Sequence, residues 1–326
     1  MFLALGVRAA SPVPTPCDSV SPDTLRVSLI TCAPGPEVYQ LFGHTAMRVQ
    51  RAGVDGFDMV FNYGVFSFSD DFVFKFTQGH TDYVLAVYDF KYFLTDYVMR
   101  GSTVYEQELN LTHAERKTVF DMLCVNARAE NRVYRYNFLI DNCATRPYHL
   151  IKNALEDTII SSYKGYEGTT FRTAITHYTG THSWVDFGIN LVFGRDADAP
   201  MTNEQRLFLP EELMNYIAHA TLSDGTALVK NQHIGTFPPA RVPWYANCWW
   251  GIGLFALLLL MISLYDRRRG RLTWGVDVAL CVVYLLLIAL VIFLTCFSCH
   301  PLVGFNWRLI LFPLIHVCTR LIYIFR

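Results

Sequence analysis

Residues 136–157, YNFLIDNCATRPYHLIKNALED, place a cysteine at the predicted start of a helix. Asp141 and Asn142 are residue types that favour the N-cap, and the apolar residues that follow recur at helical spacing. The helix is therefore expected to begin at or near Cys143. Its first turn is expected to be irregular, because Pro147 lacks an amide hydrogen and its ring crowds the preceding turn.

A cysteine at the N-terminus of a helix has the environment of a nucleophile. The positive end of the helix dipole favours the thiolate, and the unpaired amides of the first turn are suited to a developing oxyanion. By residue pattern alone, a cysteine beside a helix cap is more often simply buried than catalytic. Among ten histidines, His44 in FGHTAMRV lies between a helix-ending glycine and a strand, but spacing alone does not select the base.

The region around this helix has the pattern of an α+β domain. Short segments rich in β-branched and aromatic residues predict strands at 25–31, 46–51, 59–66, 83–90 and 103–111. Helices are predicted at 37–42, 112–128, after Cys143 and at 210–219, the second of them opened by a capping box of Thr112 and Glu115. Strands and helices in this order favour an antiparallel sheet.

The C-terminal part of the chain has the composition of a membrane region. Apolar residues make up 52% of the sequence, and most of the excess lies after Trp244. Uncharged runs of spanning length predict membrane helices at about 249–265, 278–296 and, more weakly, 309–325. We therefore expect a signal-peptide remnant and linker at 1–19, a catalytic domain at 20–243 and an all-α transmembrane domain at 244–326. The alternative is that the runs are buried core helices.

Charge distribution predicts the orientation. Four arginines, at positions 267, 268, 269 and 271, lie between the first two spans, and the positive-inside rule places them in the cytoplasm. The region before Trp244 then faces the periplasm of a bacterium, with the spans in the inner membrane. The net charge of −1 gives no overall attraction to nucleic acid, so no nucleic-acid partner is expected.

The nine cysteines do not form a disulfide framework by spacing. Five lie outside the spans, so at least one thiol is expected to be free. No paired short His/Cys spacing predicts zinc, and no Gly-rich loop predicts a nucleotide. Residues 296–300, CFSCH, match a haem-attachment pattern but lie at the end of a predicted span. Neither a cofactor nor a metal is therefore predicted.

Three segments, LITCAPGPEVYQLFGHTAMRV (29–49), VFNYGVFSF (60–68) and YNFLIDNCATRP (136–147), resemble the periplasmic domain of the Bacteroides-type lipoprotein N-acyltransferases, the Lnb family. Residues 194–214, the membrane tail and the segment with His300, Pro301, Asn306 and Trp307 resemble the same family. The likeness runs over nearly the whole chain. FGHTA (42–46) and DNCATR (141–146) are specific in combination.

The order of histidine before cysteine also resembles the permuted papain-like folds of the lecithin:retinol acyltransferase and NlpC-like groups. That resemblance implies Cys143 as nucleophile and His44 as its base, with a third polar residue orienting the imidazole. Asn62 is expected in that role and Tyr63 is the fallback, while a purely structural role for Asn62 stays open. Substrate-binding or oxyanion support is expected from a set comprising Tyr63, Asp141, Asn142 and Arg146. Candidates on the membrane side are His300, Asn306 and Arg308.

The family resemblance implies an acyl transfer through a thioester. The Cys143 thiolate would take an acyl chain from a membrane phospholipid and pass it to the α-amino group of a diacylglyceryl-cysteine lipoprotein. Two alternatives remain: a membrane-tethered cysteine amidase or peptidase of the cell envelope, and a non-enzymatic sensor or scaffold. A transferase of this kind requires an apolar slot, whereas a peptidase requires a polar groove.

Overall fold

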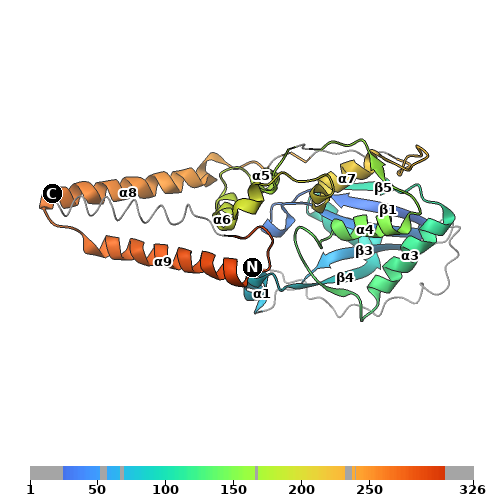
Figure 1. Ribbon diagram of the computed structural model, residues 1–326, viewed down its shortest axis with the longest axis horizontal. Coiled ribbons are helices and arrows are strands. Elements are labelled where there is room, and N and C mark those ends of the chain that lie inside the picture. Colours follow the sequence, from blue (N-terminus) through green and yellow to red (C-terminus); the bar gives the residue numbers. More distant parts are fainter. Residues whose placement is uncertain are drawn as a thin grey trace. The chain divides into compact units, whose positions relative to one another are not determined.

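The computed structural model describes residues 25–51, 57–66, 70–165, 168–231, 237–238 and 240–304 (Figure 1). Contacts between residues divide the chain into two compact units. The first comprises Met1–Gly168 and Met201–Pro238, and the second comprises Thr169–Pro200 and Pro239–Arg326. The expected functional boundary between residues 243 and 244 stays a prediction.

The first unit is built on a six-stranded antiparallel sheet with the order β5-β1-β2-β3-β4-β6. Its strands are β1 (Leu25–Cys32), β2 (His44–Arg51), β3 (Asp58–Val65), β4 (Asp82–Asp89), β5 (Val104–Glu108) and β6 (Val133–Arg135). A second, two-stranded sheet pairs β7 (Ile160–Ser161) with β8 (Ala220–Thr221). The predicted α+β class with an antiparallel sheet is confirmed.

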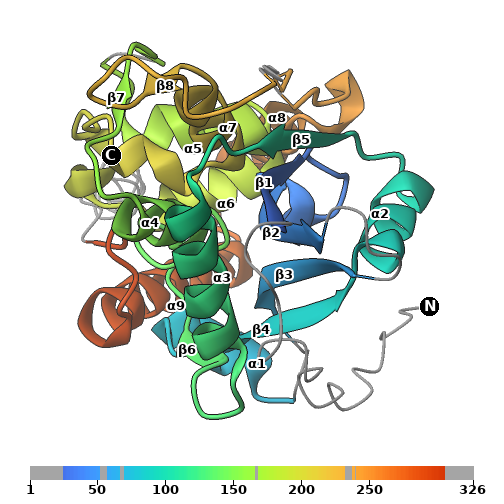
Figure 2. The ribbon, with the colours of Figure 1, turned by 90° about the vertical axis from the view of Figure 1, so that its right-hand side faces the viewer.

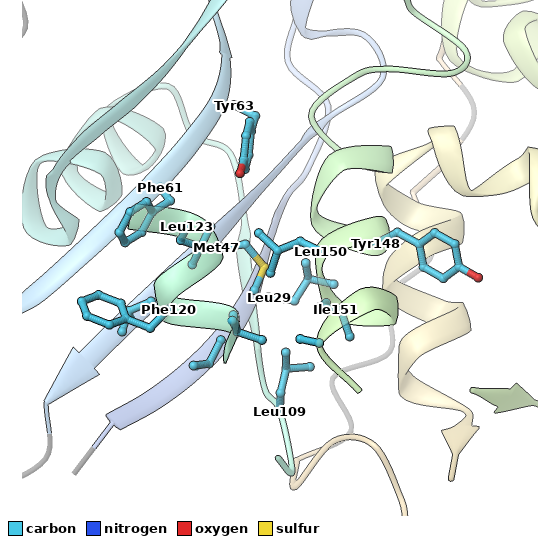
Figure 3. Packing of buried hydrophobic residues seen from close by; sticks show 14 of the residues in the cluster. Leu29, Met47, Phe61, Tyr63, Leu109, Phe120, Leu123, Tyr148, Leu150 and Ile151 are labelled. Atoms are coloured by element: carbon cyan, nitrogen blue, oxygen red, sulfur yellow. The ribbon is translucent and has the colours of Figure 1, made fainter. Parts of the chain in front are cut away.

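Helices cover both faces of the large sheet (Figure 2). The main core lies under α3 (His113–Ala127), α4 (Thr145–Ala154) and α7 (Pro210–Ala218), where Met47 and Phe61 of the sheet meet Phe120 and Ile151 of the helices (Figure 3). A smaller cluster on the opposite face joins the sheet to α2 (Phe90–Met99) through Phe93. Strand alternation therefore sends neighbouring side chains to different cores.

The helix ends follow the chemistry of the sequence. Thr112 and Glu115 form both bonds of the predicted capping box, so α3 begins where the pattern indicates. Pro210 occupies the first turn of α7, where its missing amide costs nothing. The helix expected at 37–42 is only a short 3₁₀ turn, η3 (Val38–Gln40). The first unit also contains α1 (Phe72–Gln78) and η5 (Gln205–Phe208).

The second unit contains α5 (Phe171–Thr179), α6 (Trp184–Val192), η4 (Arg195–Asp198), η6 (Trp244–Ala246), α8 (Cys248–Arg269) and α9 (Trp274–Phe297). Among the described residues, α8 and α9 are long and apolar enough to cross a membrane, and they contain the first two predicted spans. The third, at 309–325, lies outside the described residues. Asp266 is buried in the last turns of α8 and accepts a hydrogen bond from the amide of Thr273, just before α9, at 3.1 Å.

Candidate active site

Three predicted site residues come together at one end of the large sheet. His44 is the first residue of β2, Asn62 lies in β3, and Cys143 lies two residues before α4. The His44 Nε2–H donates to Asn62 Oδ1 at 2.5 Å, and the His44 side chain is also hydrogen-bonded to the Cys143 thiol. Since Nε2 is engaged by Asn62, Nδ1 is the nitrogen left for the sulfur.

The geometry depends on where β2 and β3 stop pairing. Their register runs from Met47↔Phe61 to Gln50↔Asp58, so His44 and Asn62 both lie beyond the paired part of the strands. A bulge between Asn62 and Val65 shifts the register of β3 against β4. Bulges beside active sites commonly redirect a side chain, and this one follows directly after Asn62.

Gly64 in this bulge forms one wall of the site. A Cβ at Gly64 would lie 3.5 Å from Cys143 Cβ and 3.8 Å from His44 Cε1. The φ of Gly64 is +90°, a conformation that residues with a Cβ rarely adopt. Glycine therefore leaves the space between nucleophile and base open.

The pKa values of the two groups shift toward each other. Burial alone would raise the pKa of the Cys143 thiol, but the charge and hydrogen bond of His44 outweigh it and lower that pKa. For His44, burial lowers the pKa, and the Cys143 charge, its hydrogen bond and that of Asn62 together raise it. Both shifts favour a thiolate–imidazolium pair.

Two backbone amides also stabilise the sulfur. The amides of Thr45 and of Cys143 itself both donate to the thiolate and lower its pKa. The Thr45 amide is available for this because Thr45 precedes the paired part of β2 and β3. Amides that converge on the nucleophile are also close to the position of a developing oxyanion.

Asn142 fixes the backbone at the start of α4, and its expected role in substrate or oxyanion binding stays a prediction. Its Oδ1 accepts the amides of Ala144 at 2.8 Å and Thr145 at 2.9 Å, which caps the helix. Its Nδ2 donates to the carbonyls of Phe138 at 2.7 Å and Phe208 at 2.9 Å. The residue is only 2% exposed, so its side chain is fully committed to fixing the backbone around the nucleophile.

Asp141 and Arg146 bind each other beside the nucleophile. Arg146 Nε and Nη2 donate to the two carboxylate oxygens of Asp141 at 2.5 and 2.9 Å. The guanidinium carbon also lies 3.6 Å from the centre of the Tyr134 ring. Both side chains are partly exposed, and their paired arrangement clamps the segment that carries Cys143.

The structure does not bring Tyr63 to the imidazole. Tyr63 lies on the opposite side of β3 from Asn62, is fully buried, and accepts a hydrogen bond from Asn126 at 2.8 Å (Figure 3). Sequence reasoning instead missed Tyr88, whose hydroxyl accepts the second amide hydrogen of Asn62 at 2.8 Å. The alternation of residue types along β4 predicts which face Tyr88 lies on. The register of β4 against β3, which brings Tyr88 to Asn62, cannot be read from the sequence.

Aromatic rings surround the pair. Tyr97 of α2 stacks on the His44 imidazole with centroids 6.1 Å apart. Burial first, and the negative charge of Cys143 second, raise the pKa of Tyr83 to about 12 and that of Tyr136 well above its ordinary value. The nucleophile and its base therefore lie among aromatic rings.

The remaining candidates from the sequence are His300, Asn306 and Arg308. His300 belongs to the second unit, where its amide donates to Ser298 Oγ at 3.3 Å, and Asn306 and Arg308 lie outside the described residues. Cys143 is a free thiol, while Cys124 is disulfide-bonded. Within the described ranges, no group of three or more His, Cys, Asp or Glu side chains is placed to hold a metal.

A surface hollow is separate from this chemistry. It is lined on the sheet and α2 by Arg48, Asp58, Phe90, Lys91, Leu94, Val104 and Glu106. Arg48 fills part of it by pairing with Asp58 and Glu106 at 2.6 and 2.8 Å. None of the lining residues is a member of the Cys143 site.

Comparison with protein families gives two matches. Residues 14–173 match the Lnb N-terminal periplasmic domain, and residues 247–326 match the Lnb transmembrane domain. Searches among curated proteins and among solved structures found no match. Together with the apolar helices α8 and α9, the two matches make this a membrane-anchored protein with a periplasmic domain.

Proposed function

Because the chain belongs to the Lnb family, we propose that it is a lipoprotein N-acyltransferase that works through a thioester on Cys143. The observation that carries this proposal is the Cys143–His44–Asn62 arrangement, with the pKa values of thiol and imidazole shifted toward an ion pair. A free thiol with a lowered pKa is the nucleophile that acyl transfer requires.

In the first half-reaction, the Cys143 thiolate attacks an ester carbonyl of a membrane phospholipid. The carbonyl oxygen becomes an oxyanion, and the amides of Thr45 and Cys143, which donate to the sulfur, are the donors we assign to it. Collapse of the tetrahedral intermediate breaks the ester bond. The departing alkoxide takes the proton from the His44 imidazolium and leaves as lysophospholipid, and an S-acyl group remains on Cys143.

In the second half-reaction, the α-amino group of a diacylglyceryl-cysteine lipoprotein attacks the thioester. Neutral His44 removes a proton from the attacking nitrogen, the C–S bond breaks, and the product is an amide. Cys143 leaves as thiolate beside the imidazolium, which restores the starting pair. An α-amino group has a pKa near 8, so a useful fraction is neutral at neutral pH.

Asn62 and Tyr88 complete the arrangement as positioning residues. Asn62 Oδ1 holds the Nε2–H tautomer, and Tyr88 fixes the amide so that Oδ1 rather than Nδ2 faces the ring. Imidazolium and neutral imidazole both carry the Nε2 proton, so this bond persists through the cycle. The membrane anchor keeps the enzyme where both lipid substrates reside.

The experiment expresses wild type, Cys143→Ser, His44→Ala and Cys281→Ser in a strain that lacks its own lipoprotein N-acylation. Mass spectrometry then weighs the N-terminal peptide of a lipoprotein. Cys281 is an exposed free cysteine of α9, so its replacement is a matched control for loss of a thiol. An added acyl chain is expected with wild type and Cys281→Ser alone. An unmodified N-terminus in all four strains, with folded protein in the membrane, would overturn the proposal and favour a cysteine amidase or peptidase.

A further inference from the structure

A series of aromatic rings leads from the surface of the first unit to its nucleophile. Tyr39 of η3 meets Phe66 edge to face at 6.0 Å, Phe66 stacks on Tyr83 at 5.0 Å, and Tyr83 stacks on Tyr136 at 4.0 Å. We call these four residues the aromatic track. It joins η3, the end of β3, β4 and the segment before Cys143, so residues far apart in the sequence form one continuous apolar path.

The outer end of the track lies among exposed apolar side chains. Tyr39 is 55% exposed and its neighbour Val38 is 62% exposed. Phe66 also stacks on Phe72 at 5.4 Å, which connects the track to α1. We call the exposed apolar residues of η3 and α1 the apolar rim: Val38, Tyr39, Val73, Phe74 and Phe76.

The inner end of the track lies within electrostatic reach of the sulfur. The negative charge of Cys143 adds to burial in raising the pKa of both Tyr83 and Tyr136. The two rings are stacked face to face at 4.0 Å, so their edges together form an apolar wall. A ligand lying along this wall would meet the thiolate at its end.

The composition of the rim indicates what covers it. Exposed apolar side chains grouped in this way mark an interaction site, because leaving them in water is unfavourable. Lys75, in the middle of α1, is neutralised by Asp71 at 2.6 Å, so the rim offers no strong charge to a charged partner. The protein is membrane-anchored, and aromatic side chains are favoured at the boundary between headgroups and acyl chains.

We propose that the apolar rim enters the surface of the lipid bilayer and that the aromatic track binds the acyl chain of the donor lipid, guiding its ester to Cys143. This proposal rests on the proposed function and assigns its acyl-chain site. Flat rings in contact suit a chain of methylene groups, which needs no hydrogen bonds. The track thus offers an apolar surface of the kind that a lipid acyltransferase requires for its acyl chain.

The first test maps the lipid directly and does not depend on catalysis. The full chain with Cys143→Ala is reconstituted in phosphatidylethanolamine vesicles in which one acyl chain ends in a photoreactive diazirine. Crosslinks in α8 and α9 verify insertion. Additional crosslinks in peptides containing η3, α1 and Phe66 are expected. Crosslinks confined to α8 and α9 would overturn the proposal.

The second test compares donors of different chain length. Acylation of Cys143 by p-nitrophenyl acetate and by p-nitrophenyl palmitate is followed in wild type and in the double variant Tyr39→Ser/Phe74→Ser. Each methylene that loses its apolar contact weakens binding about fourfold, so loss of contact with two methylenes should slow palmitate acylation about 16-fold while acetate acylation stays unchanged. Tyr39→Phe retains the ring and should match wild type. Ile160→Ser alters an equally exposed residue of β7 (53%) and is the control.

The two tests separate failure of the track from failure of the function. If wild type accepts neither ester on Cys143, the thioester mechanism itself fails. If wild type accepts both esters and the double variant lowers both equally, or neither, the acyl-chain site is refuted while the transferase stands.

Discussion

The replacement Asn142→Ala distinguishes a structural role of this residue from a role in binding substrate. The side chain makes four hydrogen bonds, two to amides at the start of α4 and two to the carbonyls of Phe138 and Phe208. Loss of a helix cap costs about 0.5–2 kcal/mol. The buried carbonyl of Phe208, left without a donor, adds about 1–3 kcal/mol, and the partly buried carbonyl of Phe138 adds less. We therefore expect a loss of about 3–5 kcal/mol in the free energy of unfolding.

The assay is thermal unfolding of the full chain in detergent, followed by intrinsic fluorescence. A domain of this size loses about 2–4 °C in Tm for each kcal/mol, so the melting temperature of the first unit should fall by roughly 10 °C. Thr112→Ala is the matched control, because Thr112 also caps a helix of the same unit but does not contact Cys143. It should cost about 1 kcal/mol, or roughly 3 °C.

The reasoning would be refuted by one combination of results. If Asn142→Ala melted within about 2 °C of wild type while lipoprotein acylation was lost, the side chain would act on the substrate or the oxyanion. The hydrogen bond from the Asn142 side chain to the Phe208 carbonyl would then contribute little to the free energy of unfolding.

His44→Ala removes the largest influence that lowers the Cys143 pKa while burial, which raises it, remains. Iodoacetamide should therefore alkylate Cys143 about tenfold more slowly at pH 7, and the midpoint of the alkylation rate against pH should move to higher pH. Equal midpoints in wild type and variant would contradict the ion pair. Asn62→Ala removes a bond that raises the His44 pKa and should lower kcat by roughly 10–100-fold with little change in KM, whereas a change in KM alone would assign Asn62 to binding. Tyr88→Phe retains the ring but not the acceptor for Asn62 and should lower kcat about threefold to tenfold; wild-type kcat would remove it from the site. Gly64→Ala places a methyl group against both Cys143 and His44 and should nearly abolish acyl-enzyme formation, measured by the mass of the intact protein; full acylation would show that the wall is dispensable.

Much of the fold followed from local patterns. The five long strands, the capping box of α3 and the proline at the start of α7 agree with the structure because each rests on short-range chemistry. The short strand β6 was missed because it has only three residues and its exposed Val133 is apolar, so its residue types do not alternate as its burial does. The helix expected at 37–42 reduces to a 3₁₀ turn without a side-chain cap.

The candidate site was only partly accessible from the sequence. Asn62 could be proposed from the sequence because a polar side chain in the middle of an apolar strand requires a hydrogen-bonding partner when it is buried. Tyr88 did not stand out, because its role depends on the register of β3 against β4, which places Val60 opposite Tyr88 and Asn62 opposite Ala86. Asn142 looked like a site residue for the same reason that it caps α4: a short polar side chain directly before the nucleophile suits both roles.

The bridge between Phe193 and Val303 has a consequence for the order in which the protein matures. The amide of Gly194 donates to Leu302 at 3.0 Å, and a Cβ at Gly194 would lie 2.8 Å from the Cα of Gly304, so the two backbones touch. Phe193 leaves the ribosome early, and Val303 leaves it only after both α8 and α9 have been made. Domains generally fold in the order of their synthesis. The segment after α6 therefore lacks its pairing with residues 302–303 until the chain has crossed the bilayer and returned. Closure of this joint therefore requires both membrane crossings, because a chain that failed to cross back would hold Val303 on the other side of the bilayer from Phe193.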